Sequence, residues 1–186
     1  MIKKEKLNIT WECSTRADLF DKELAVTMKD SGCVQVYLGL ESGTQQTLNF
    51  LNKGLTIERT IDAVSIAKNA GLRVESNFMI GIPGETKDSI NKTISFVKKM
   101  NIDYPSFTIL TPYPGTPLYS YAEKNNLLLS KEWSLYTANE PVMSVPGISY
   151  RELKGLYLKA FLICSFNLPK IVKSLVRELR LKKYYN

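Results

Sequence analysis

Four stretches of the chain alternate apolar and polar residues with the period of a β-strand, and helical patterns follow them. The strands are predicted over residues 7–12, 34–41, 73–81 and 106–111. Helices are predicted over 17–30, 44–51, 86–100 and 118–125, with a longer one from a Thr56 cap to Gly71. Helix-length spacers between strands are typical of βα units, whose right-handed crossovers make the strands parallel. The pattern therefore predicts a parallel α/β fold.

One face of the predicted sheet is persistently polar. A sheet buried on both faces reads as a nearly continuous apolar run, so this face must meet water, a ligand or a polar partner. An antiparallel sheet with one solvated face is the alternative, and the helix-length spacers disfavour it. The predicted inner face comprises Glu12, Ser14, Arg16, Gln35, Tyr37, Gly39, Glu41, Glu75, Asn77, Gly81, Ser106 and Thr108.

The pattern changes after residue 126. Residues 127–148 predict a loop or linker, and residues 149–166 a helix. A second helix follows Pro169, with apolar residues at helical spacing from Leu168 to Leu179 and basic residues on its other faces. A packed helix with a solvated face is favoured there over a membrane-surface segment. We therefore expect a partial barrel over residues 1–126, and a linker and basic C-terminal helical extension over residues 127–186.

Composition narrows the chemistry. The chain has no histidine, which excludes Ser-His-Asp and Cys-His nucleophile systems and most zinc sites. Its three cysteines are scattered, which fits a reducing cytoplasm rather than a disulfide framework. The net charge of +7 comes from residues 151–186, because residues 1–150 are balanced. Nucleic acid is disfavoured as a partner, and no apolar run is long enough to span a membrane. Chemistry must come from carboxylates, backbone groups or a cofactor.

Three glycine-containing loops close the last three strands, at residues 39–43, 81–86 and 111–117. Glu41, at a strand end, is suited to accept hydrogen bonds from the hydroxyls of a ribose. Glycines in the first two loops would let a ligand approach the backbone. Thr86 begins a helix whose free N–H groups would suit an anion. The loops therefore favour a nucleoside-containing ligand beyond the carboxyl ends of the strands.

At this point the residues resemble a known family, the radical S-adenosylmethionine superfamily, and more narrowly its Elp3/MiaB/NifB-type core, common in cobalamin-binding members. The resemblance covers roughly residues 7–136. It rests on Trp11, Arg16-Ala17-Asp18, Gly32-Cys33, Gly39-Leu40-Glu41-Ser42-Gly43, Lys53-Gly54, Ala70-Gly71, Phe78 to Thr86, Thr111 to Thr116 and Glu132-Trp133.

The resemblance implies a fold, cofactors and site residues. The fold would be the last four strands of an open (βα)6 barrel. S-adenosylmethionine would be the cofactor, with Glu41 on its ribose or methionine moiety and Arg16 on its carboxylate. The loop from Gly81 to Gly84 would flank it, and Thr111 to Tyr113 would lie near its adenine or the substrate. The full implied cofactor-binding set is Arg16, Glu41, Ser42, Asn77, Gly81, Pro83, Gly84, Thr111, Pro112 and Tyr113.

The chain departs from this family in its cysteines. The family holds a [4Fe-4S] cluster with a C-x3-C-x2-C motif, and Cys13, Cys33 and Cys164 do not form one. We therefore expect no catalytic or metal-binding residue here, and a partner that supplies the N-terminal half of the barrel. The complete protein would carry the cluster, is compatible with cobalamin, and would perform methyltransferase or methylthiotransferase-like chemistry; this part alone would be inactive. The alternatives are a complete small α/β protein that binds a nucleotide or phosphate without a cluster, and a non-catalytic scaffold with a membrane-surface basic tail.

Overall fold

The computed structural model describes residue 5 and residues 7–165. Its centre is a four-stranded sheet in the order β1-β2-β3-β4, with every pair parallel. The strands are β1 Trp11–Arg16, β2 Cys33–Gly39, β3 Arg73–Ile80 and β4 Tyr104–Ile109. The predicted parallel α/β fold is therefore confirmed, and the antiparallel alternative is wrong.

Strand β1 begins four residues later than predicted. Its pairing with β2 starts at Trp11, opposite Cys33, and the Trp11 N–H donates to the Gly32 carbonyl. Residues 7–10 extend beyond the start of β2, and no strand among the described residues pairs with them, so Leu7 and Ile9 are exposed. An apolar alternation is not enough to make a strand where no neighbouring strand pairs with it.

The helices are α1 Lys22–Asp30, α2 Gln45–Phe50, α3 Ile57–Asn69, α4 Lys87–Lys99, α5 Pro117–Lys124 and α6 Tyr150–Ser165. The helix predicted over 17–30 is interrupted, because the Asp21 side chain accepts the Leu24 N–H and starts α1 afresh. The predicted Thr56 and Thr86 caps are both confirmed. None of the described helices is long and apolar enough to cross a bilayer.

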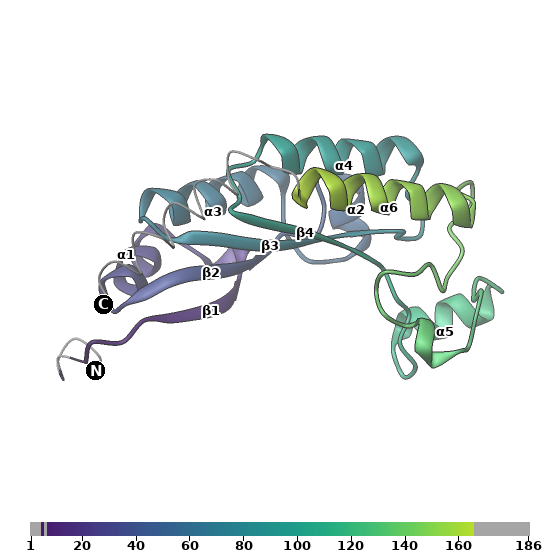
Figure 1. Cartoon of the computed structure of the whole chain (residues 1–186), viewed down its shortest axis with the longest axis horizontal. Coiled ribbons are helices and arrows are strands. Elements are labelled where there is room, and N and C mark those ends of the chain that lie inside the picture. The colour runs from purple at the N-terminus through teal and green to yellow at the C-terminus, as the bar shows by residue number, and fades with distance from the viewer. Residues whose placement is uncertain (1–4, 6, 166–186) are drawn as a thin grey trace.

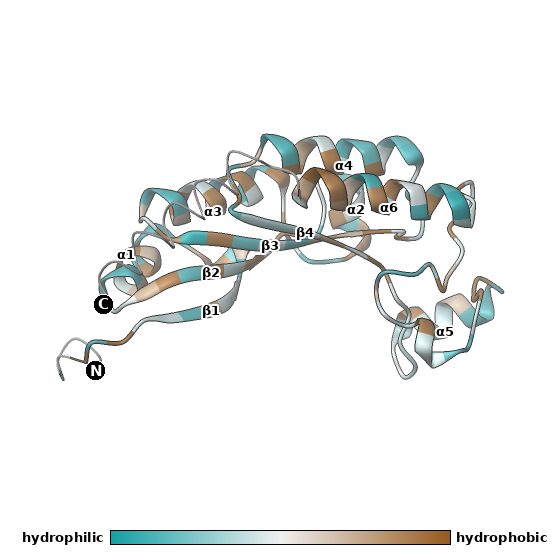
Figure 2. Cartoon of the chain, in the orientation of Figure 1, coloured by the Kyte–Doolittle hydropathy of each residue, from teal (hydrophilic) through white to brown (hydrophobic). Residues whose placement is uncertain are grey.

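Helices cover one face of the sheet and leave the other open. Figure 1 shows α1, α3, α4 and α6 on the same side of the strands, and Figure 2 shows apolar bands along these helices. The core lies between the two layers and includes Val36, Leu38, Phe78, Ile80 and Ile109. The opposite face is the one that the alternation assigned to polar residues.

Helix α6 packs on β4 and α4 and adds Leu153, Tyr157 and Ala160 to the same core. The domain boundary expected at residue 126 stays a prediction. The second helix expected after Pro169 lies outside the described residues.

A small lobe, residues 110–148, separates β4 from α6. It contains α5 and a short 3-10 helix, Trp133–Leu135. In Figure 1 this lobe lies beyond the end of the sheet, on the side away from the covering helices. It therefore flanks the open face at the carboxyl end of β4.

Candidate functional site

Polar side chains on the open face bond to one another across the strands. Gln35 Nε2 donates to Glu75 Oε2 at 2.8 Å, joining β2 to β3. Asn77 Nδ2 donates to Thr108 Oγ1 at 2.8 Å, and the Ser106 hydroxyl donates to Asn77 Oδ1 at 3.1 Å. These cross-strand bonds satisfy groups that an apolar core could not accommodate. The predicted polar face is therefore an ordered surface that a polar ligand can meet.

Glu41 lies just beyond the carboxyl end of β2. Its N–H donates to the Asn77 carbonyl at 3.3 Å, and its own carbonyl accepts the Met79 N–H at 2.8 Å. Its φ is +66°, in the left-handed region that non-glycine residues seldom adopt. Such strain costs about 1–3 kcal/mol and gathers at functional sites. The bonds to β3 hold Glu41 in this conformation.

The Glu41 side chain is 14% exposed, and its Oε1 lies 3.0 Å from Lys53 Nζ. A Cβ added at Gly39 would lie only 3.3 Å from the same oxygen. The absence of a side chain at Gly39 therefore leaves room for the Glu41 carboxylate. Burial raises the pKa of Tyr37, which lies in β2, and the negative charges of Glu41 and Glu75 raise it further. The two carboxylates and this phenol therefore share one face.

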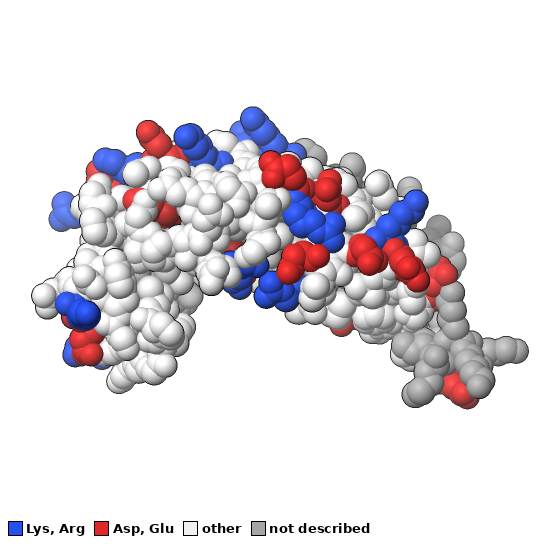
Figure 3. All heavy atoms as spheres, turned by 180° about the vertical axis from the view of Figure 1, so that it is seen from behind, with Lys and Arg blue, Asp and Glu red and all other residues white. Residues whose placement is uncertain are grey.

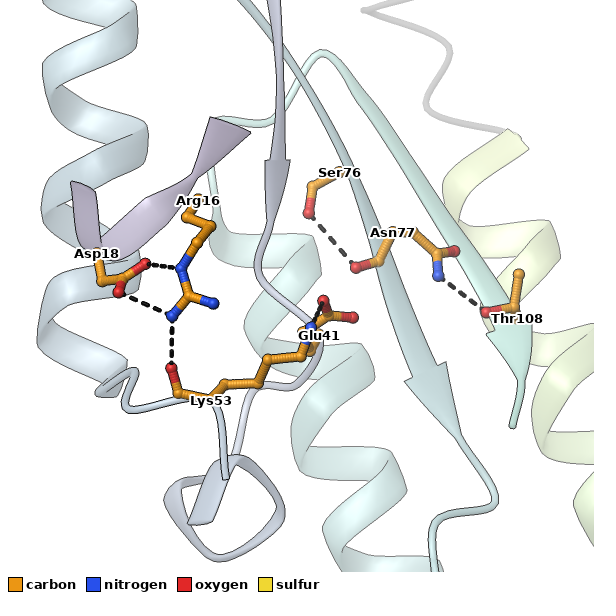
Figure 4. A network of polar contacts seen from close by, with 7 residues as sticks. All are labelled: Arg16, Asp18, Glu41, Lys53, Ser76, Asn77 and Thr108. Carbon is orange, nitrogen blue, oxygen red and sulfur yellow. Dashed lines mark hydrogen bonds and ion pairs between the residues drawn. The ribbon is translucent and has the colours of Figure 1, made fainter. Parts of the chain in front are cut away.

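Arg16 and Asp18 complete a charged rim with Glu41 and Lys53 (Figure 4). Arg16 Nε and Nη2 each donate to an Asp18 carboxylate oxygen at 2.9 Å, and Nη2 also donates to the Lys53 carbonyl at 3.1 Å. The hydrogen bond from Arg16 holds the pKa of Asp18 below its usual range. A ligand carboxylate at Arg16 would therefore have to share or replace Asp18.

The loop after β3 is held by a buried carboxylate. Glu85 Oε2 accepts the N–H groups of Gly81 at 2.8 Å and Ile82 at 3.0 Å, and Thr47 Oγ1 donates to Oε1 at 3.4 Å. Burial raises the pKa of Glu85 to about 7, against the lowering effect of these bonds. The N–H groups of Gly81 and Ile82 are thus already bonded within the chain.

Two further expectations for this loop need correction. The N–H groups of Thr86 and Ser89 bond reciprocally to each other's hydroxyls, so these two N–H groups of the helix start are already satisfied within the chain. A Cβ at Gly81 would lie 3.1 Å from the Leu153 side chain. The absence of a side chain at Gly81 therefore makes room for α6 rather than for a ligand. By contrast, Gly84 is exposed and no described residue other than its chain neighbours lies within 4 Å of its Cβ position, while Pro83 is buried.

Ser42 and Gly43 face the covering helices. The Ser42 side chain is fully buried, lies 3.3 Å from the Thr93 hydroxyl and accepts the Thr44 N–H. A Cβ at Gly43 would lie 2.7 Å from Phe96, so the predicted close approach there is made by α4. The side chain of Ser42 therefore joins the first loop to α4 rather than lining the open face.

In the third loop, Thr111 and Pro112 are buried, and the Thr111 hydroxyl donates to the Ile109 carbonyl. Tyr113 is exposed, and its hydroxyl donates to the Tyr136 carbonyl at 3.1 Å. Of the ten candidate residues, the structure brings Arg16, Glu41, Asn77, Gly84 and Tyr113 to accessible positions at this end of the sheet.

Residues important to this end of the sheet were missed as candidates. Lys53 and Asp18 pair with the predicted residues, and Glu85 holds the second loop. All three residues stand inside motifs that carry the family resemblance, so their place in a motif was the available signal. Periodicity could not have found the Lys53–Glu41 pair, because Lys53 lies in an irregular segment after α2.

The described thiols do not fit a four-iron cluster. In residues 5 and 7–165, no three His, Cys, Asp or Glu side chains gather where they could hold a metal ion. Cys13 and Cys33 are neighbours in β1 and β2, and burial raises the pKa of both thiols. Cluster ligands are closely placed thiolates, which a raised pKa disfavours. Cys33 is confirmed as a buried core residue.

Fold and site together define an α/β half-barrel with a polar open face and a charged rim at its carboxyl ends. The chain belongs to the radical SAM superfamily, because that family's sequence model matches residues 1–97. Members of this family use S-adenosylmethionine with a [4Fe-4S] cluster.

Two relatives and one solved structure illustrate the likeness. The chain is 45% identical over 172 residues to an uncharacterized methyltransferase of Pyrococcus horikoshii, covering 92% of this chain and 37% of that protein. It is 30% identical over 198 residues to bacteriochlorophyllide d C-8(2)-methyltransferase of Chlorobaculum tepidum, covering 97% of this chain and 44% of that protein. The methyltransferase TsrM from Kitasatospora setae, with cobalamin and a [4Fe-4S] cluster bound, shares the fold at a TM-score of 0.60 and 18% identity, over 67% of this chain and 24% of that one. The chain thus spans less than half the length of these proteins.

Proposed function

We propose that this chain forms the C-terminal part of a radical S-adenosylmethionine core whose complete protein transfers methyl groups. The observation that carries the proposal is Glu41, which has a strained backbone and whose carboxylate lies beside the polar face at the carboxyl end of β2. The methyltransferase relatives support the reaction class.

The described residues fit the nucleoside end of the cofactor. Glu41 would accept hydrogen bonds from the ribose hydroxyls, with Lys53 holding one of its oxygens in place. Asn77 would present its amide from the neighbouring strand, and the exposed Gly84 backbone would flank the cofactor. Arg16 would orient the cofactor carboxylate by exchanging one of its Asp18 bonds. Bound here, S-adenosylmethionine supplies the radical and methyl-group chemistry.

We also propose that the rest of the barrel pairs with β1. In the described sheet β1 has a neighbour on one side only, β2. An unpaired strand edge is a template for another strand, and the longer relatives leave room for further strands. That part would supply the cluster cysteines and, where used, the cobalamin contacts. A reducing cytoplasm suits the scattered cysteines of this chain.

The test is calorimetric titration of S-adenosylmethionine into the barrel completed by its N-terminal part. Glu41→Ala leaves ribose hydroxyls unpaired, so we expect affinity to fall about tenfold or more, with Glu41→Gln intermediate. Glu58→Ala, exposed in the first turn of α3, is the matched control and should bind as the wild type does. Unchanged affinity for a folded Glu41→Ala protein would overturn the proposal.

A further inference from the structure

Three aromatic rings form a cluster in the lobe beyond β4. The rings of Trp133 and Tyr136 lie 5.1 Å apart at 46°, and those of Tyr113 and Tyr136 lie 6.1 Å apart at 55°. Tyr136 is buried at 8% exposure, whereas Tyr113 is 49% and Trp133 61% exposed. The buried ring thus supports two rings that present large apolar areas to solvent.

The cluster is held in place by hydrogen bonds to backbone carbonyls. The Tyr113 hydroxyl donates to the Tyr136 carbonyl at 3.1 Å, and the Tyr136 hydroxyl donates to the Ser130 carbonyl at 2.9 Å. Fixed aromatic rings lose little conformational entropy when a ligand covers them, and they favour offset or tilted stacking. This arrangement is therefore preorganised to receive another ring.

The cluster lies at the same end of the sheet as Glu41. The Ile109 N–H, at the end of β4, donates to the Ala138 carbonyl at 2.7 Å, which fixes the segment carrying Tyr136 beside that strand end. Tyr113 follows β4 by four residues. Figure 1 shows the lobe beyond the carboxyl ends of the strands, where the open face ends.

The charged residues just before Trp133 already have partners within the lobe: the Glu132 carboxylate accepts the Ser134 hydroxyl at 2.5 Å. Lys131 Nζ lies 2.7 Å from Glu123 Oε1. On the side seen in Figure 3, the lobe is mostly uncharged, with its charged residues gathered in one small group. The exposed rings are therefore suited to an uncharged, flat surface rather than to an ionic group.

We propose that Tyr113 and Trp133, supported by Tyr136, form a stacking platform for a flat conjugated ring of the substrate. Nucleobases, indoles and tetrapyrroles share this chemistry, because each has an extended π-face. The assignment of the ring to a substrate rests on the proposed function; the platform itself rests on the ring geometry.

The experiment uses the 186-residue chain with adenosine, indole and protoporphyrin IX as separate probes. The chain has two tryptophans, so in a Trp11→Phe background the fluorescence reports Trp133 alone. We expect at least one probe to quench this fluorescence saturably, and calorimetry on the same chain to give its affinity. Tyr113→Ala should weaken that probe about fivefold or more, and so should Trp133→Ala measured by calorimetry. Trp133→Phe should retain most of the affinity.

Tyr121→Ala is the matched control, because Tyr121 is an exposed tyrosine of α5 in the same lobe and outside the cluster. It should bind as the wild type does. The platform is refuted if no probe binds, if Tyr121→Ala weakens binding as much as Tyr113→Ala, or if folded Tyr113→Ala and Trp133→Ala chains bind normally.

Glu41→Ala separates this proposal from the previous one. Ring binding that survives Glu41→Ala supports the platform, even where S-adenosylmethionine binding is absent and the proposed function fails. Adenosine binding that depends on Glu41 and not on Trp133 would count against the platform.

Discussion

The two faces of the sheet differ although the same four strands make both. On the covered face, Phe78 and Val36 are fully buried against the helices and contact other apolar side chains. On the open face, Asn77, next to Phe78 in sequence, is partly exposed and bonds to Thr108 and Ser106. Burial therefore stabilises the first face through area removed from water, and the second is ordered through specific polar pairs. Only the second leaves hydrogen-bonding groups accessible to a ligand.

Replacing Phe78 with alanine should have the largest effect on stability. It would leave a cavity in a core that also holds Phe107, whose ring lies 5.7 Å away, and we expect a loss of about 3–5 kcal/mol. Asn77→Ala, one residue along on the open face, should cost only about 1 kcal/mol. Urea unfolding of both variants checks the contrast. Equal losses would contradict the division between the two faces.

The pH dependence of the free energy of unfolding should reflect the ionisation of Glu85, a buried carboxylate on the covered side. Its folded-state pKa of about 7 lies above the ordinary glutamate value, so its ionised form is disfavoured by folding. Below both pKa values the group is protonated in both states and this penalty is absent. As the pH rises from the ordinary glutamate pKa to about 7, only the unfolded chain releases the proton. The free energy of unfolding should therefore fall by on the order of 3 kcal/mol over this interval and then level off.

Unfolding measured from pH 4.5 to 8 in wild type and Glu85→Gln isolates this contribution. The variant cannot ionise, so its stability should lack the fall between about pH 4.5 and 7. An identical fall in both proteins would assign the pH dependence to other groups.

The smallest effect is expected at the exposed rim. Lys53→Met removes the ion pair with Glu41, and exposed pairs contribute about 0.2–1 kcal/mol that salt weakens. Thermal unfolding at low and high salt would measure it. A loss of several kcal/mol, as for Phe78, would show that the rim is part of the folding core and would break the comparison.

Much of the fold could be predicted because its signals are local. The alternation in 73–81 and the helix from the Thr56 cap to Gly71 depend on residues close in sequence, and both agree with the structure to within about one residue. The start of β1 could not be predicted in this way, because it depends on where β2 begins some twenty residues later. The accessible candidates Glu41 and Asn77 followed from the parity of their strands.

The sequence by itself determined the order and approximate position of the strands and helices, which sheet face is polar, and the family to which the loops point. Only the tertiary structure decided what each loop residue contacts. Gly81 makes room for Leu153, 72 residues later, and the carboxylate of Glu85 accepts the N–H groups of Gly81 and Ile82. Side-chain periodicity reports one segment's exposure, whereas such contacts depend on how crossovers bring distant segments together. The contact between Tyr113 and Tyr136 arises in the same way, because it joins positions 23 residues apart that only folding places side by side, whereas Trp133 and Tyr136 are near neighbours in sequence.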